Sequence, residues 1–208
     1  MDFEGAKKYI VERMKRGLAP NLYYHGLHHT FDVYAACERY AEMEEVRGTD
    51  RLILLTAALF HDAGFLIRYK DNEEVSVDMV RRILPNYGYS KTEITLINQC
   101  ILSTVIPQSP FDKISSILCD ADLDYLGRDD FFIIGCNLRR EWKEYGTELS
   151  IKEWYEQQVR FLSNHHYFTR SADFLRSEKK LRHLYYLDNL VKKHQKMSLL
   201  FLNLQMKK

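Results

Sequence analysis

The sequence predicts an all-α protein, and two features carry this prediction. Only four prolines and nine glycines interrupt 208 residues, and the alternation of apolar and polar residues that marks half-buried strands is scarce. Hydrophobic residues make up 46% of the chain, enough to bury a substantial core. No internal repeat or low-complexity linker divides the chain. We therefore expect one compact multi-helix bundle over residues 1–208, with a C-terminal helical part over about 147–208.

The first helices are bounded by glycine, proline and changes in apolar pattern. The first is amphipathic and ends at Gly17, and a loop through Pro20 leads to the second. The third is apolar almost all round, which predicts a buried central helix. The fourth is broken by Pro85 and Gly88 in the sequence LPNYGY. The four expected helices are residues 3–16, about 29–45, 49 to about 66, and the segment that follows Ser76.

Later helices are marked mainly by their N-caps. Ser90 with Glu93, and Ser150 with Glu153, have the spacing of a capping box, in which each side chain binds a free backbone amide of the first turn. The expected helices run from Ser90 to before Pro107, through FDKISSILCDADLDYLG to Gly127, from Asp129 or Asp130 to about Tyr145, from Ser150 through WYEQQVRFL, and from about Thr169 to Leu204. The tail from about residue 170 is either part of the bundle or a separate packing or oligomerisation element, and a homodimer is compatible with it.

Charge and hydrophobicity exclude several classes of protein. Thirty Lys and Arg nearly balance 29 Asp and Glu, unlike a general nucleic-acid binder. The longest apolar run, Leu52 to Phe60, is far shorter than the ~20 residues that span a membrane. The N-terminal sequence MDFEGAKKYIVERMKRG lacks the form of a signal peptide. The four cysteines form no CxxC pair and read as reduced thiols, so we expect a cytoplasmic protein without membrane partners.

His61 and Asp62 stand inside the most apolar segment, LTAALFHDAGF. Burying two ionisable groups among Leu, Ala and Phe is costly unless something compensates their polarity. A divalent cation does so by binding neutral imidazole and carboxylate together, and the flanking small residues leave room for another group. The alternative is a buried His–Asp hydrogen bond.

The stretch YYHGLHHTFDV places three of the eight histidines within five residues. His25 and His29 are four apart, so they share a helix face or straddle a helix start. Either arrangement lets one bind a metal while the other faces a substrate. His28 points elsewhere in a helical register. The alternative for the whole cluster is a solvated helix start.

Three alternating acids follow in ILCDADLDYLG: Asp120, Asp122 and Asp124. They do not form an EF-hand, which requires Gly at its sixth and Glu at its twelfth position. Counted from Asp120, Tyr125 and Phe131 occupy those positions. A carboxylate on an otherwise apolar helix is again a candidate metal ligand.

The ordered motifs YHGLHHTFDV, LFHDAG and CDADLDYLG resemble the H…HD…D pattern of the HD-domain superfamily of metal-dependent phosphohydrolases, in particular stand-alone bacterial HD proteins. HGLHHTFDV and ADLD are also distantly similar to elements of the cyclic-nucleotide phosphodiesterases. The motifs cover about residues 20–130, with 32 residues from His29 to His61 and 60 from Asp62 to Asp122.

The resemblance implies a role for each matching residue. His29, His61, Asp62 and Asp122 match the metal ligands, and the catalytic residues are His25, which protonates the leaving group, and Asp62. Asp120 is a rival to Asp122 and otherwise hydrogen-bonds nearby. Asp32 either orients a histidine or is an ordinary exposed acid. Asp120 and Asp32 are thus candidates for residues that contact the metal ligands without binding the metal themselves.

Two positions depart from the relatives. Gly26 replaces the usual Asn of the phosphodiesterase element, and Asn72 stands before Glu73 where many relatives have a histidine that holds a second metal. The resemblance therefore implies one firmly held divalent ion, which could be Mn, Mg, Fe, Ni, Co or Zn. A second ion would rely on Asp62, water and substrate phosphate, aided by Glu73 or Glu74.

The resemblance implies cleavage of a phosphomonoester or phosphodiester, by attack of metal-activated water, in a nucleotide or related small metabolite. The candidate phosphate-binding residues are Arg68, Lys70 and Arg128. The alternative for each is an ordinary solvated charge without a role in binding. The alternative function is a regulatory HD domain that binds nucleotide or metal without turnover, and a third is di-iron oxidation, which needs more histidine ligands. We interpret His165 and His166 in NHHYFTRS as structural.

Overall fold

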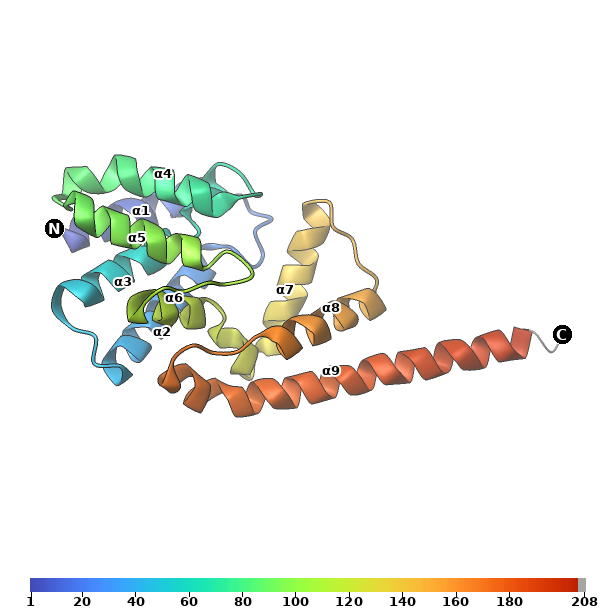
Figure 1. Cartoon of the computed structure of the whole chain (residues 1–208). Helices are drawn as coiled ribbons and strands as arrows, with labels where there is room; N and C mark the ends of the chain where they lie inside the picture. Colours follow the sequence, from blue (N-terminus) through green and yellow to red (C-terminus); the bar gives the residue numbers. More distant parts are fainter. Residues whose placement is uncertain (206–208) are drawn as a thin grey trace. The chain divides into compact units, whose positions relative to one another are not determined.

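A computed structural model describes the backbone of residues 1–205 and the side chains of residues 1–193. Within residues 1–205 the secondary structure consists of helices, turns and bends, without strands, so the all-α prediction is confirmed. The chain divides into two compact units (Figure 1). Unit 1 is residues 1–124 with 167–173, and unit 2 is residues 125–166 with the chain from 174 onward. The single domain expected over residues 1–208 stays a prediction.

Unit 1 is built around helix α3. Eight consecutive residues of this helix, Ile53 to Phe60, are buried, and α3 packs against α1, α2, α5 and α6. The prediction of a buried central helix is therefore confirmed. The elements of unit 1 are α1 (Phe3–Gly17), α2 (Leu27–Met43), α3 (Gly48–Phe60), η1 (Ala63–Leu66), α4 (Asn72–Ile83), η2 (Leu84–Tyr87), α5 (Lys91–Ser103) and α6 (Lys113–Asp122).

Three helix boundaries in unit 1 were wrong in the sequence prediction. The helix expected to run to Gly127 is α6, which ends at Asp122 and is followed by the separate 3₁₀ helix η3 (Asp124–Gly127). The third helix ends at Phe60 and not near Leu66, because the backbone turns at Asp62 into the short 3₁₀ helix η1. The fourth begins at Asn72 and not after Ser76. The Ser76 hydroxyl does not cap a helix, because it binds the carbonyl of His61 at 2.8 Å and the amide of Gly64 at 2.8 Å.

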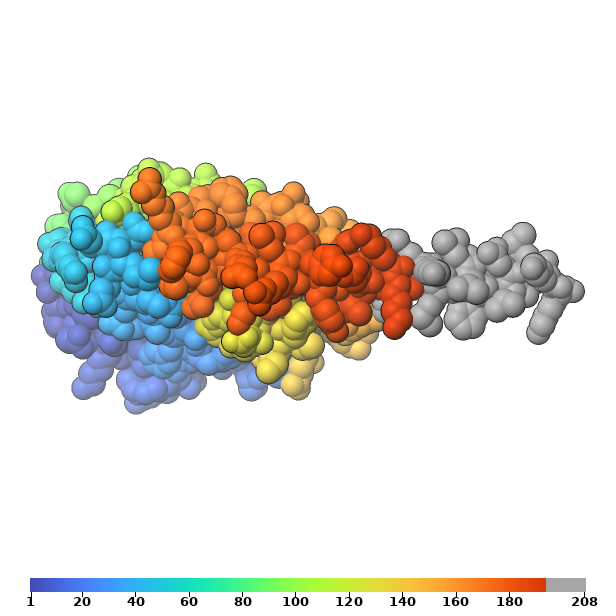
Figure 2. Space-filling view, turned by 90° about the horizontal axis from the view of Figure 1, so that it is seen from below, coloured from blue at the N-terminus to red at the C-terminus, as the bar shows by residue number. Residues whose placement is uncertain are grey.

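Unit 2 contains α7 (Phe131–Glu144), α8 (Ile151–Asn164) and most of α9 (Arg170–Gln205), and η3 (Asp124–Gly127) lies at its beginning. Aromatic contacts join its helices: Trp142 meets Trp154 edge to face at 5.5 Å, and His183 stacks on Phe131 at 4.6 Å. The surface of α9 faces the viewer in Figure 2 up to residue 193. Large apolar side chains on α9 are highly exposed, among them Phe174 (82%) and Tyr185 (71%).

The predicted caps are mostly present. Both capping boxes, at Ser90 with Glu93 and at Ser150 with Glu153, form as expected. Asp130 occupies the N-cap position of α7 without a capping hydrogen bond, because its carboxylate binds Arg128. None of the helices in the described part of the chain combines the length and apolar character needed to cross a membrane.

Candidate metal centre

Three helices of unit 1 bring four ionisable side chains together. His29 lies in the first turn of α2, His61 and Asp62 follow the last residue of α3, and Asp122 is the last residue of α6. Both α2 and α3 pack against α6, so residues up to 93 positions apart converge. The side chains are 7% (His29), 2% (His61), 9% (Asp62) and 15% (Asp122) exposed, so the cluster is deep and opens most at Asp122.

The ligand atoms of this cluster face one another. The Nε2 atom of His29 lies 3.1 Å from Asp122 Oδ1, 3.5 Å from Asp62 Oδ2 and 3.4 Å from the Nε2 atom of His61. The Nε2 atom of His61 lies 3.3 Å from Asp62 Oδ2 and 3.6 Å from Asp122 Oδ1. Among the residues whose side chains are described, the group His29, His61 and Asp122 satisfies the spacing of a metal site, and Asp62 supplies a fourth atom.

These distances fit a bound cation better than a network of hydrogen bonds. Around a cation with bonds of about 2.0–2.2 Å, neighbouring ligand atoms lie roughly 3.0–3.5 Å apart. The buried Oδ2 atom of Asp62 has no hydrogen-bond partner, although two imidazole nitrogens lie within 3.5 Å of it. A buried carboxylate oxygen left without a partner is costly, and a cation among the four atoms removes that cost.

The tautomer of His61 supports the same interpretation. Its Nδ1 atom lies 2.8 Å from the carbonyl oxygen of Ala58, which can only accept a hydrogen bond. Nδ1 therefore carries the proton, and in the neutral ring the lone pair of Nε2 points into the cluster. Hydrogen bonds of this kind orient metal-binding histidines in many proteins.

The cluster has an excess of negative charge that favours a cation or a proton. Burial alone would lower the pKa of His61, but the Asp62 carboxylate and hydrogen bonds to Asp122 and Asp62 outweigh burial and raise this pKa well above its ordinary value. Burial opposes ionisation of Asp122, yet hydrogen bonds from His29 and His61 hold its pKa well below the ordinary value. The pKa of Asp62 is also lowered, against burial, by His61.

The backbone around the His61–Asp62 pair is fixed by α4. Ser76 bridges the His61 carbonyl and the Gly64 amide, so one side chain of α4 holds both sides of the pair. Gly64 lies so close to α4 that a Cβ atom would stand 1.9 Å from the carbonyl oxygen of Asn72. Only glycine fits this position without displacing the helix.

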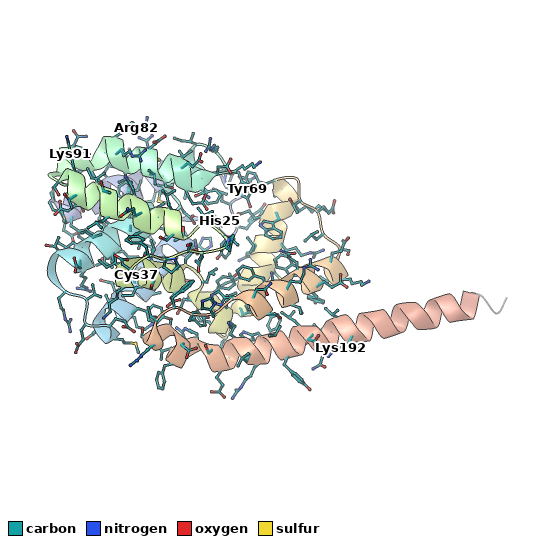
Figure 3. The ribbon with its side chains drawn as sticks, in the orientation of Figure 1. His25, Cys37, Tyr69, Arg82, Lys91 and Lys192 are labelled. Atoms are coloured by element: carbon teal, nitrogen blue, oxygen red, sulfur yellow. The ribbon has the colours of Figure 1, made fainter. Side chains whose placement is uncertain are left out.

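His25 lies beside the cluster in an aromatic pocket. Its ring stacks on Phe65 at 4.3 Å, meets Tyr24 edge to face at 4.5 Å, and lies 5.9 Å from the ring of His29. Tyr69 is 6.2 Å away, and Figure 3 shows the two labelled side chains near each other. His25 is half-buried, so its ring is held in place while part of it stays accessible. His28 is exposed, as expected of a bystander.

The three alternating acids have three different surroundings. Asp122 joins the histidines, whereas Asp124 binds the hydroxyl of Tyr40 and the guanidinium of Arg39. Asp120 accepts hydrogen bonds from the backbone amides of residues 168 and 169, each at 2.8 Å. Asp120 therefore fastens the segment after α8 onto α6, a contact with distant rather than nearby residues.

Other predicted residues lie outside the cluster. Arg68 is exposed and donates hydrogen bonds to the Asp71 carbonyl and to Glu74 at 2.8 Å. Arg128 belongs to unit 2, where it forms a two-pronged ion pair with Asp130. Asp32 is half-buried on α2, and its role beside a histidine stays a prediction.

Asn72 and Glu73 begin α4 at the position where relatives carry a histidine. The buried Oδ1 atom of Asn72 has no hydrogen-bond partner. The pKa of Glu73 is raised by burial and by the negative charges of Asp62 and Asp122.

Gln108 is a site residue that the sequence prediction missed. It lies between α5 and α6, and its Nε2 atom is 3.0 Å from the Cys119 carbonyl and 3.5 Å from Asp122 Oδ2. Gln108 thus contacts the Asp122 oxygen that does not face His29. Its only sequence signal is a polar side chain between Pro107 and Pro110 in the loop before the acidic run.

Comparison with known proteins identifies the family. Residues 26–123 match the family model of the HD domain. This part of the chain is an HD domain. It includes all four cluster residues and begins one position after His25. Families with this domain are generally metal-dependent hydrolases, and the group His29, His61 and Asp122 in this chain could hold a metal ion.

One curated relative is an uncharacterized protein of Clostridium beijerinckii. It is 36% identical to this chain over 81 residues, which are 38% of this chain. The matched region spans about half of that relative, 51% of its length. No solved structure matches the chain.

Proposed function

We propose that the HD domain hydrolyses a phosphate ester of a small molecule, a nucleotide, and that His29, His61, Asp62 and Asp122 hold the divalent ion required. The observation that carries this proposal is the spacing of 3.1–3.6 Å among their ligand atoms, with His25 beside them. Two imidazoles and two carboxylates leave coordination positions open for water and substrate. An ion bound there supplies a water of lowered pKa and positive charge to stabilise the phosphoryl oxygens.

The protein groups divide the remaining work. Asp62 and Asp122 would hold the ion. Their negative charges repel other anions, so a substrate phosphate is favoured where it contacts the ion directly. His25 would donate a proton to the departing oxygen, and such general acid catalysis contributes roughly 10²–10⁴-fold. Stacking on Phe65 holds the imidazole in a defined orientation for this transfer.

The side chains around His25 support a nucleotide as the substrate. Tyr69 is half-buried and lies 5.3 Å from Phe65, so it forms an aromatic edge suited to a planar base. Arg68, the preceding residue, is exposed and pairs with Glu74. It would anchor the substrate by releasing Glu74 and binding a phosphate group instead. Arg128, the other predicted anchor, belongs to unit 2, where it pairs with Asp130, and its role in substrate binding stays a prediction.

The test is a screen of nucleotides and phosphorylated metabolites with Mn²⁺, Mg²⁺, Ni²⁺, Co²⁺, Fe²⁺ or Zn²⁺, following release of phosphate or nucleoside monophosphate. Wild-type protein should turn over at least one compound only with metal present. Asp62→Ala should lose this turnover. His25→Gln should retain metal and lose roughly 10²–10⁴-fold in kcat. Turnover that persists in Asp62→Ala would remove the proposed mechanism.

A regulatory HD domain is the second candidate, and Asn72 favours it. An amide in place of a histidine weakens any second metal site, which catalysis on some substrates requires. In that case a nucleotide should raise the melting temperature without being hydrolysed, and rapid turnover of the same nucleotide would exclude this function. Two iron atoms per chain after anaerobic loading would instead favour oxidative chemistry.

A further inference from the structure

A groove on unit 1 lies apart from the metal centre. It is a cavity of about 790 Å³ between α1, η1 and η2, and its lining contains none of the four cluster residues and no histidine. Small-molecule sites commonly measure about 300–1,000 Å³. The lining residues used below are Lys8, Tyr9, Arg13, Arg16, Leu66 and Tyr87.

A second cavity of about 330 Å³ extends this groove towards α4. Both cavities share Tyr9, Arg13 and Tyr87, so these three side chains form the middle of one continuous groove. The extension adds Arg82 and the apolar side chain of Met79. Figure 3 shows Arg82 near the end of α4, away from the labelled His25.

The groove is strongly basic. Lys8, Arg13, Arg16 and Arg82 line it, against a single acid, Glu12. Glu12 already has a partner outside the groove, because Lys15 binds it at 2.9 Å while Arg16 is farther away at 3.7 Å. Guanidinium groups bind phosphate with paired, charge-assisted hydrogen bonds, so this lining favours an anion with several phosphate oxygens.

The groove also has aromatic and apolar walls. The half-buried rings of Tyr9 and Tyr87 lie 6.0 Å apart and are tilted by 51°, and Leu66 adds an aliphatic wall. Arg13 donates a hydrogen bond to the Tyr9 hydroxyl at 2.9 Å, which fixes the ring edge beside a positive charge. A planar heterocycle stacks well on such rings.

Glycine keeps the groove open at two positions. A Cβ atom on Gly17 would stand 2.8 Å from Leu66 Cδ2, and one on Gly5 would stand 3.0 Å from Tyr87 Cδ1. Both glycines line the cavity. A larger side chain at either position would therefore crowd the walls that the two glycines leave accessible.

We propose that this groove is a second binding site, which takes a nucleotide: phosphates on Arg13, Arg16 and Arg82, and the base against Tyr9 and Tyr87. Its lining has neither histidine nor paired carboxylates, so it binds the nucleotide without hydrolysing it. Leu66 belongs to η1, the segment that leaves the His61–Asp62 pair, so the bound nucleotide would touch the backbone next to the metal centre. The inference does not require that the HD domain hydrolyse anything.

The test uses the full chain in EDTA, where metal-dependent turnover is absent. ATP, GTP, CTP and UTP are each titrated by calorimetry, with pyrophosphate and the matching nucleosides as partial probes. At least one nucleotide should bind saturably with one equivalent per chain. It should bind at least tenfold more tightly than pyrophosphate or its nucleoside, because only the nucleotide uses both walls.

Two double variants with equal charge change separate the groove from general electrostatics. Arg13→Glu with Arg82→Glu alters the groove, whereas Arg81→Glu with Lys91→Glu alters exposed cations on α4 and α5 that do not line it. The first pair should weaken nucleotide binding at least tenfold and the second less than twofold, with equal melting temperatures. Absence of saturable binding, equal loss in both pairs, or pyrophosphate binding as tightly as the nucleotide would overturn the proposal.

Discussion

Each of the two units contains a histidine with a shifted pKa, and the two histidines have opposite electrostatic surroundings. In unit 1, His61 is 1% exposed and faces Asp62 and Asp122, which raise its pKa well above the ordinary value. In unit 2, burial together with the charges of Lys180 and His166 lowers the pKa of His165 to about 3. Lys180 donates to the Nδ1 atom of His165 at 3.2 Å and also binds its carbonyl oxygen.

This difference indicates that the neighbours, and not the number of histidines, decide which cluster is suited to hold a cation. Both regions contain adjacent histidines in the sequence, at positions 28–29 and 165–166. Only the first places an imidazole between carboxylates. In the second, the ammonium group of Lys180 repels any metal ion, and the neutral imidazole serves as a hydrogen-bond acceptor.

The largest effect is expected from Asp122→Asn. The substitution keeps the shape of the side chain and removes one of two negative charges that face the histidines. We expect the affinity for Mn²⁺ to fall by more than about 100-fold, since even residues behind the ligands contribute roughly 10–100-fold. Metal content after dialysis measures this change, and one retained equivalent of Mn²⁺ would contradict it. His165→Asn in unit 2 should leave the metal content unchanged.

Glycines in the two units give the next comparison. Gly64→Ala should lower the free energy of unfolding by about 3 kcal/mol, because its methyl group would stand 1.9 Å from the Asn72 carbonyl and must displace α4. Gly135→Ala, inside α7, meets its nearest neighbour at 3.7 Å and should raise that free energy by up to about 1 kcal/mol. Urea unfolding tests both, and equal effects would show that the close approach at Gly64 is absent.

The pH dependence of metal binding is expected to be about tenfold per pH unit. A raised pKa means that His61 carries a proton at neutral pH in the metal-free protein, and this proton must leave when the metal binds. The affinity should therefore rise with pH until pH exceeds that pKa, and fall on acidification. Calorimetry in buffers of different ionisation enthalpy counts the released protons. Zero released protons between pH 6 and 7 would contradict the acidic surroundings of His61.

The smallest effect concerns the hydrogen bonds of His165. His165→Phe removes the acceptor for Lys180, which is only 5% exposed. We expect the free energy of unfolding to fall by about 1 kcal/mol, because the buried ammonium group loses one acceptor while it keeps the backbone carbonyl of residue 165. His166→Phe, at the exposed neighbouring position, is the matched control and should change it by about 0.5 kcal/mol or less. A similar loss in both variants would mean that Lys180 gains little from His165.

Much of the fold could be predicted because local signals agreed with the packing. The capping boxes at Ser90 and Ser150 form, and the apolar run ending at Phe60 is the central helix. The predictions failed where the side chain that carries a capping signal has another hydrogen-bond partner. Ser76 reads as a helix start but binds the backbone on both sides of the His61–Asp62 pair, and Asp130 reads as a cap but pairs with Arg128.

The candidate site was predictable only in part, for a similar reason. The HD pair is informative because charged groups in an apolar helix need compensation. In contrast, Asp120, Asp122 and Asp124 have equivalent local sequence, and only the path of α6 directs one to the histidines and another to residues 168–169. Gln108 and Phe65 acquire their places from loops and rings packed around the cluster, which no spacing along the chain encodes.

The most direct test of the central claim is anomalous X-ray diffraction from crystals grown with Mn²⁺. We predict one Mn²⁺ peak within about 2.0–2.3 Å of His29 Nε2, His61 Nε2, Asp62 Oδ2 and Asp122 Oδ1, and none at His165. An ordered structure in saturating Mn²⁺ with no peak among these four atoms would contradict the account.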